Sequence, residues 1–232
     1  MDFRHLIGRS GVGQAFADRQ EAGKELASRL WNYRGRDDVV VLALPRGGVP
    51  VAFEVADALD AALDVFVVRK LGMPGHEELA MGAIASGGIR VLNEDVVRWA
   101  GIPENVIEVV SQREQTELER REREYREGRP ATALGSKIVI LVDDGLATGS
   151  TMRAAVQAVR AHNPGKVIVA VPVGAPDTCE QFAGVADETV CARTPEPFSA
   201  VGLWYRDFSQ TGDDEVRALL QQHAARIASG AR

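Results

Sequence analysis

The stretch IVILVDDGLATGSTM, residues 138–152, decides the fold of this chain. Its five leading apolar residues predict a strand buried on both faces, which is typical of a parallel sheet. Two adjacent carboxylates, Asp143 and Asp144, end the strand, and a short loop leads into a predicted helix that begins near Ser150. Open α/β sheets bind ligands at this edge, beyond the carboxyl ends of their strands. We therefore expect a ligand site over residues 143–151.

The loop between strand and helix has the features of a phosphate site. The backbone N–H groups of residues 147–151 lie at a predicted helix N-terminus, where unpaired donors and the helix dipole favour an anion. Gly149 allows close approach of the backbone, and the hydroxyls of Ser150 and Thr151 add donors. The motif is neither a Walker A loop nor a dinucleotide fingerprint, because the glycines and lysine that define those motifs are absent from it.

The paired carboxylates indicate what the phosphate belongs to. Two acids beside a phosphate would repel it unless they bind another part of the same ligand. The vicinal hydroxyls of a ribose are suitable partners for such a pair, and a hydrated Mg²⁺ is the other. A ligand that offers all of these groups is a phosphorylated ribose.

The rest of the chain repeats the alternation of strand and helix. Apolar runs predict strands at 39–44, 65–68, 137–142 and 166–173, and helical spacing predicts helices at 18–31, 49–62, 150–161 and 177–182. Alternation at this spacing predicts an α/β domain with a mostly parallel sheet flanked by helices. Cys179 and Cys191 are too few for a disulfide framework or a metal cluster, and we expect inert thiols.

Two segments interrupt the alternation. Residues 71–92 are rich in glycine and predict a mobile loop followed by a β-hairpin around residues 86–88. Residues 104–128 predict a long helix, whose part from 112 to 129 holds six arginines and six glutamates. Such a helix is either a nucleic-acid or partner helix, or a solvated helix with Glu–Arg pairs at i, i+3 and i+4. We favour the second, because balanced charge offers phosphates little.

Composition limits the function classes. The 232 residues include 27 basic and 33 acidic side chains, for a net charge of −6, and 45% are hydrophobic. This composition suits a globular enzyme, and the net charge argues against nucleic acid or an anionic membrane as partner. The apolar runs are too short for a membrane span, and the first residues lack the apolar core of a secretory signal. We therefore expect a cytoplasmic protein.

At the level of motifs, LVDDGLATGST (141–151) resembles the phosphoribosyl pyrophosphate (PRPP) signature of the type I phosphoribosyltransferases. The resemblance implies that Asp143 and Asp144 bind the ribose 2- and 3-hydroxyls. It also implies that these two acids hold Mg²⁺, directly or through water. The residues that would bind the rest of PRPP in this loop are Gly145, Ala147, Thr148, Gly149, Ser150 and Thr151.

Two further stretches resemble the same family, in the family's order. ALPRGGVPVA (43–52) resembles its pyrophosphate loop, in which Arg46, Gly47 and Gly48 would bind the diphosphate. VVRKLGMPGHEE (67–78) resembles the start of its flexible catalytic loop. The resemblance implies that Lys70 reaches the pyrophosphate with Arg69 beside it.

The general acid or base is left open by the motif. Some purine-salvage members carry an Asp directly before the Thr-Gly of the PRPP loop, whereas this chain has Ala147, as in the adenine-type signature. Adenine-type enzymes place a carboxylate in the flexible loop instead. Glu77 and Glu78 are the candidates for that role here, and the alternative is that both are solvated.

The resemblance implies one phosphoribosyltransferase domain over 1–232, with a core at about 18–192, a charged helical insertion at about 94–128 and a C-terminal hood at about 193–232. The aromatic residues of 194–208 either stack a base or pack this segment onto the sheet. The implied activity is Mg²⁺-dependent transfer of the phosphoribosyl group of PRPP to a small nitrogenous acceptor, such as a nucleobase, by a homodimer. The alternatives are a PRPP- or nucleotide-sensing regulator without turnover, and a hydrolase that uses water as acceptor.

Overall fold

The computed structural model describes residues 15–230, apart from the side chains of Glu77 and Glu78. Its main sheet has five parallel strands in the order β2-β1-β6-β7-β8. The strands are β1 (Val39–Ala43), β2 (Ala62–Val65), β6 (Ile138–Val142), β7 (Lys166–Val173) and β8 (Glu188–Arg193). The predicted parallel α/β sheet is confirmed. The first 14 and last two residues of the predicted domain lie outside the described part.

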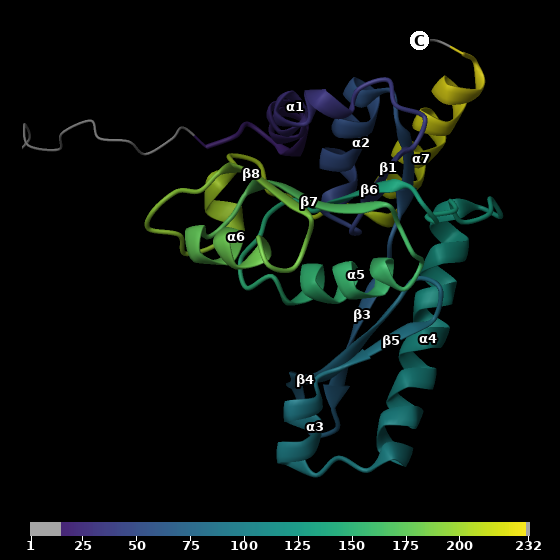
Figure 1. Cartoon of the computed structure of the whole chain (residues 1–232), viewed down its shortest axis with the longest axis vertical. Helices are drawn as coiled ribbons and strands as arrows, with labels where there is room; N and C mark the ends of the chain where they lie inside the picture. The colour runs from purple at the N-terminus through teal and green to yellow at the C-terminus, as the bar shows by residue number, and fades with distance from the viewer. Residues whose placement is uncertain (1–14, 231–232) are drawn as a thin grey trace, which may run out of the picture.

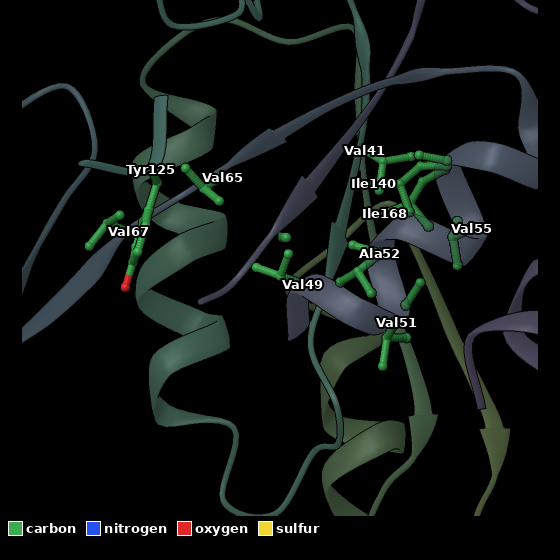
Figure 2. Close-up of a cluster of buried hydrophobic side chains, with 14 of the residues drawn as sticks. Val41, Val49, Val51, Ala52, Val55, Val65, Val67, Tyr125, Ile140 and Ile168 are labelled. Carbon is green, nitrogen blue, oxygen red and sulfur yellow. The ribbon is translucent and has the colours of Figure 1, made fainter. Parts of the chain in front are cut away.

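Helices cover both faces of this sheet (Figure 1). They are α1 (Arg19–Arg29), α2 (Gly48–Leu59), α5 (Ser150–Arg160), α6 (Pro176–Phe182) and α7 (Asp213–Ala228). Successive side chains of a strand point to opposite faces. Val41 of β1 therefore packs with α1, α2 and α7, as Figure 2 shows in part, whereas Leu42 packs with α5 and α6. The continuous apolar runs are explained by this burial on two faces.

A second sheet and two helices form an arm that extends away from the main sheet (Figure 1). The arm consists of the antiparallel strands β3 (Val68–Met73), β4 (His76–Ala85) and β5 (Ile89–Leu92), followed by α3 (Glu94–Ala100) and α4 (Glu104–Arg126). The predicted hairpin around residues 86–88 is confirmed as the β4–β5 turn. The mobile loop predicted before it is wrong, because paired strands with the register Lys70↔Ala83 occupy that segment.

Two strand predictions also need correction. The strand predicted at 65–68 is in fact the junction between β2 and β3, and β2 begins three residues earlier. The pattern was misleading because β2 contains Asp64, whose buried carboxylate pairs with Arg126 of α4. Strand β8 was missed, because its residues are all half-buried and form no apolar run.

Helix α4 confirms the predicted long, charged helix, but only its outer face is solvated. There Arg120 pairs with Glu117 and Glu124. The inner face is buried and includes Glu114, Leu118 and Tyr125. No helix among residues 15–230 is long and apolar enough to cross a membrane.

Three of the four aromatic side chains of residues 194–208 pack on the fold, whereas Phe208 is 37% exposed. Phe16 and Tyr205 are buried together with Val173, and Phe198 and Trp204 pack against them. These contacts favour packing over base stacking as the role of the aromatic cluster. The cysteines also differ from expectation, because Cys179 of α6 and Cys191 of β8 form a disulfide. The two residues lie on elements that become neighbours only through the fold.

Candidate functional site

The two acids of the motif lie at the carboxyl end of β6, as predicted. The backbone N–H of Asp144 donates to Oδ1 of Asp143 at 2.8 Å. Oδ2 of Asp144 accepts from Nε of Arg19 at 2.9 Å and lies 2.8 Å from Arg19 Nη2. The side chains of Arg19 and Asp144 are only 11% and 17% exposed. Each acid thus keeps one oxygen engaged within the protein and one that no hydrogen bond of residues 15–230 uses.

Arg19 was missed by the sequence analysis. It begins α1, 125 residues before Asp144, and its guanidinium also donates to the carbonyl oxygen of Ser209 at 2.7 Å. The same guanidinium lies 4.0 Å from the ring centroid of Phe208. The hydroxyl of Tyr205 donates to the carbonyl oxygen of Asp144. The first helix and the C-terminal segment therefore both converge on the second acid.

Electrostatics explains why this cation is present. Burial raises the pKa of Asp143 well above its usual value, and the neighbouring charge of Asp144 raises it further. Burial also raises the pKa of Asp144, but the guanidinium of Arg19 opposes that rise. The site thus concentrates negative charge where water screens it poorly, which favours a hydroxyl donor or a cation as ligand.

The phosphate loop is supported from behind by β7 and α6. Leu146 donates its N–H to the carbonyl of Val173 at 2.9 Å and accepts from Ala175 at 2.8 Å. Thr178 of α6 donates its hydroxyl to the carbonyl of Ala147 at 2.7 Å. The disulfide between α6 and β8 lies on this same side, because a Cβ added to Gly174 would meet the sulfur of Cys179 at 2.5 Å. These contacts hold the loop while Ala147, Thr148 and Ser150 stay exposed.

Gly149 has a conformational reason to be glycine. It caps α5 with φ +73°, which side chains with a Cβ rarely adopt, and an added Cβ would lie 2.6 Å from the ring of Phe182. The helix starts immediately after it, so that the first N–H groups of α5 point out of the helix end. The other residues of the predicted phosphate loop lie next to this cap. Gly145 and Thr148 precede α5, and Thr151 is in its first turn.

The predicted pyrophosphate loop lies against the acids. A Cβ added to Gly47 would stand 2.1 Å from Oδ2 of Asp144, and one added to Gly48 would stand 2.8 Å from the carbonyl oxygen of Val142. Only glycine permits this approach of the two loops. Arg46 follows a cis peptide bond, and its Nη1 lies 3.8 Å from Oδ2 of Asp213.

Arg69 and Lys70 lie on opposite faces of β3. Lys70 lines a cavity of about 470 Å³ between the small sheet and α5, together with Ser150, Thr151 and Arg153. Arg69 points the other way, and its Nε donates to Oε2 of Glu114 at 2.9 Å. The structure therefore brings Lys70, and not Arg69, toward the phosphate loop. The backbone of Glu77 and Glu78 lies in β4, but their side chains fall outside the described part.

The acids also fit the metal that the motif implies. Among the described residues no group of three or more His, Cys, Asp or Glu side chains could hold a metal ion. Mg²⁺ needs no such group, since it usually binds one or two carboxylates, water and the phosphates of the substrate. The two unengaged oxygens of Asp143 and Asp144 match that requirement.

Comparison with known proteins identifies the class to which this fold and site belong. Residues 14–183 match the family described as the phosphoribosyl transferase domain. The chain therefore belongs to the phosphoribosyltransferase family, and its fold is that of the type I members. The resemblance seen in the motifs is confirmed.

Individual members of the family are similar to this chain over most of its length. Two Mycobacterium tuberculosis proteins, from strains H37Rv and CDC 1551 / Oshkosh, are provisionally named phosphoribosyl transferases and are 53% identical to this chain over 207 residues. The match covers 89% of this chain and 46% of each relative, so the chain spans about half their length. The crystal structure of TT1426 from Thermus thermophilus is 42% identical, with a TM-score of 0.79, and the match covers 90% of this chain and 99% of that one.

Proposed function

We propose that the chain transfers the 5-phosphoribosyl group of PRPP to a nitrogenous acceptor, such as a nucleobase, and releases pyrophosphate. The observation that carries this proposal is the meeting of the two loops at the acids. Gly47 of the pyrophosphate loop lies against Asp144, and Asp144 directly precedes the phosphate loop. One ligand with a diol between a monophosphate and a diphosphate spans this arrangement.

In this proposal the ribose is held from two sides. Its hydroxyls donate to the free oxygens of Asp143 and Asp144, and its 5-phosphate accepts from the N–H groups at the start of α5. Arg19 supports the acids by occupying the other oxygen of Asp144. The ligand is thus fixed at both ends of the sugar, which orients C1 for reaction.

The reaction is a displacement at C1. The bond between C1 and the pyrophosphate oxygen breaks with its electron pair on pyrophosphate, and a bond from C1 to the acceptor nitrogen forms. The acceptor then loses the proton of that nitrogen. Lys70 and Arg46 stabilise the charge on the departing pyrophosphate. Mg²⁺ held by Asp143 and Asp144 would supply further neutralisation of the same charge.

The proton acceptor in this proposal is a carboxylate of β4. Glu77 and Glu78 follow the β3–β4 turn, on the element that also carries the strand partner of Lys70. Replacement of each by Gln separates them, since loss of turnover in one variant identifies the base. Unchanged turnover in both variants would remove the role from this strand.

The experiment that tests the function is pyrophosphate release from PRPP and Mg²⁺, measured over a panel of purines, pyrimidines and other amines. We expect release that depends on one class of acceptor. The control is the double variant Asp143→Asn, Asp144→Asn, in which release should fall at least about 100-fold, because the diol and metal ligands are lost. Tight PRPP binding without release from any acceptor would make the chain a regulator, and acceptor-independent release would make it a hydrolase.

A further inference from the structure

Helix α4 has no part in the function proposed above, although it is the longest helix of the described residues. Its inner face is apolar at Ile107, Val110 and Leu118, as expected for a helix that packs on other elements. Three polar groups interrupt this face: the carboxylate of Glu114, the hydroxyl of Tyr125 and the hydroxyl of Ser111, which has no hydrogen-bond partner among residues 15–230. Buried polar groups need partners, and the partners of Glu114 and Tyr125 belong to the candidate site's loops or their neighbours.

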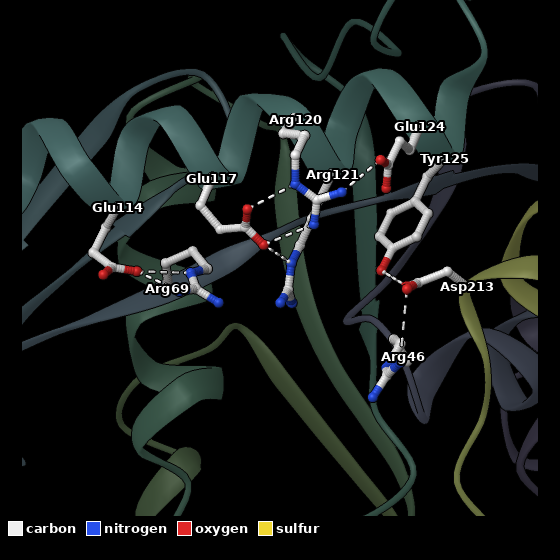
Figure 3. A network of polar contacts seen from close by, with 9 residues as sticks. All are labelled: Arg46, Arg69, Glu114, Glu117, Arg120, Arg121, Glu124, Tyr125 and Asp213. Atoms are coloured by element: carbon white, nitrogen blue, oxygen red, sulfur yellow. Dashed lines mark hydrogen bonds and ion pairs between the residues drawn. The ribbon is translucent and has the colours of Figure 1, made fainter.

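Helix α4 contacts the chain on both sides of the junction between β2 and β3. Arg126 donates from Nε to Oδ1 of Asp64 and from Nη2 to the carbonyl oxygen of Val65, each at 2.9 Å. Glu114 accepts from Arg69 of β3 at 2.9 Å (Figure 3). All four side chains of these two ion pairs are less than about a third exposed. The direction in which β3 leaves the main sheet is therefore set by α4.

This direction determines where Lys70 points. Adjacent residues of a strand face opposite sides, so a strand whose Arg69 is held against α4 presents Lys70 to the other side. That side is the cavity that Ser150 and Thr151 of the phosphate loop also line. Glu114 is thus connected to Lys70 through Arg69, the preceding residue of β3.

A second contact leads from α4 to the pyrophosphate loop. The hydroxyl of Tyr125 donates to Oδ1 of Asp213 at 2.6 Å, and Oδ2 of Asp213 lies 3.8 Å from Nη1 of Arg46 (Figure 3). Burial raises the pKa of Tyr125, and the hydrogen bond to Asp213 raises it further, so its hydroxyl remains a donor. Among the described side chains, Asp213 is the acid that pairs with Arg46. The long contact leaves other guanidinium N–H groups available to a diphosphate.

We propose that α4 is a positioning helix for the pyrophosphate half of the site: Glu114 acts on Lys70, and Tyr125 acts on Arg46. This inference rests on the proposed function. The ribose half is supported by β6, α5 and Arg19, and the hydrogen bonds and ion pairs of α4 within residues 15–230 do not reach it. Tyr125 acts on Arg46 of the pyrophosphate loop alone and should affect pyrophosphate and not ribose 5-phosphate. Glu114 acts on Lys70, which also faces Ser150 and Thr151 of the phosphate loop.

The test is calorimetric titration of the full chain with Mg²⁺–pyrophosphate and, separately, with ribose 5-phosphate. The variants are Glu114→Gln and Tyr125→Phe, each of which keeps the shape of its side chain. The first removes the charge that pairs with Arg69 and Arg113, and the second removes the hydroxyl that donates to Asp213. We expect each to bind pyrophosphate about five- to tenfold more weakly. For Tyr125→Phe the ribose 5-phosphate affinity should stay within about twofold of wild type. The matched control is Glu117→Gln on the outer face of the same helix, which should change neither affinity.

Comparison of the two ligands distinguishes a positioning role of α4 from a general role in folding. Parallel loss of both affinities in Tyr125→Phe, or unchanged pyrophosphate affinity in both variants, would overturn the positioning role. Thermal melts show whether Glu114→Gln, which removes the charge that pairs with Arg69, is folded. If it is not folded, the result for Tyr125→Phe decides. A wild-type chain that binds neither ligand would instead overturn the proposed function and this inference with it. A wild-type chain that binds both, with variants indistinguishable from it, would overturn the inference alone.

Discussion

The main sheet and the arm are stabilised in different ways. Every residue of β1 and β6 is buried, and their side chains pack on helices at both faces. In the arm, only one face of α4 is buried, and ion pairs such as Glu114–Arg69 and Arg126–Asp64 fix how it meets the strands. In the proposed function, the main sheet thus positions the loop and the two acids that bind the phosphate and the diol. The arm orients one side chain, that of Lys70. Apolar burial suffices for the first task, and the second requires directional contacts.

Whether the arm folds independently of the main sheet can be tested at Leu118. Leu118 of α4 is fully buried in the same apolar cluster as Val41 of the main sheet. Leu118→Ala should lower the free energy of unfolding by about 3 kcal/mol, because it leaves a cavity in a shared core. Urea denaturation measures this, with Val109→Ala as the control, since Val109 of the same helix is 67% exposed. Two separate unfolding transitions would show that the arm and the sheet are independent.

Removal of the disulfide measures how much the stability of the main sheet region depends on this covalent bond. Cys179 and Cys191 are 12 residues apart in sequence, and their bond joins α6 to β8 behind the phosphate loop. The double variant Cys179→Ser, Cys191→Ser should lose about 2 to 3 kcal/mol of stability in non-reducing buffer, because the unfolded chain gains freedom. Wild type in excess dithiothreitol should match the variant. Titration of two free thiols in the native, unreduced protein would contradict the bond.

Arg19 tests whether the ribose half of the site needs a positioned cation as the pyrophosphate half does. Arg19→Gln should bind ribose 5-phosphate about tenfold more weakly, because charge-assisted hydrogen bonds to Asp144 are lost. Arg19→Lys keeps the charge without the fork and should lie between wild type and Arg19→Gln. Calorimetry provides the measurement. Tighter binding by Arg19→Gln would mean that Arg19 competes with the ligand for Asp144.

The smallest effect concerns the packing of α7 on the main sheet. His223 is buried, its Nε2 lies 3.0 Å from the carbonyl oxygen of Ala61, and its Nδ1 has no partner among the described residues. Burial lowers the pKa of His223, with a smaller contribution from Arg226, while the hydrogen bond to Ala61 and the charges of Asp57 and Asp60 oppose this lowering. Below the unfolded-state pKa of about 6.5 the unfolded chain binds a proton that the folded chain resists, so stability is lost as the pH falls.

The variant His223→Gln isolates this contribution, since its amide can still donate to Ala61. Between pH 8 and pH 5 the free energy of unfolding should fall more for wild type than for the variant. Equal falls in the two proteins would show that His223 titrates as freely in the folded chain as in the unfolded one.

Much of the main sheet could be predicted because its signals are local. A buried strand, two acids, a glycine-containing loop and a helix start follow one another in residues 138–152, so that neighbours in sequence are neighbours in space. The same holds for Gly47 and Gly48, which follow β1 within five residues. The prediction was less successful at β8 and at the β2–β3 junction. There, half-burial or a buried ion pair replaces the apolar run on which the prediction depends.

The failures at the site have one physical cause. Arg19 reaches Asp144 over 125 residues, Glu114 pairs with Arg69 over 45 residues, and Cys179 meets Cys191 across two elements. Each is a side-chain contact between segments whose separation in sequence carries no periodic signal. The alternation of β3 does imply that Arg69 and Lys70 face opposite sides, but not which of them faces the phosphate loop.

The order of residues alone was thus enough for the parallel sheet, the phosphate loop and the pair of acids, since each depends on hydrophobic periodicity or on backbone geometry within a few residues. The folded chain decided which cations serve the site. A guanidinium or ammonium group acts where its long side chain is held, and contacts such as Glu114–Arg69 and Arg19–Asp144 exist only after distant segments have packed together. The length and apolar pattern of each segment specify the scaffold, whereas the orientation of the charged side chains depends on the tertiary structure.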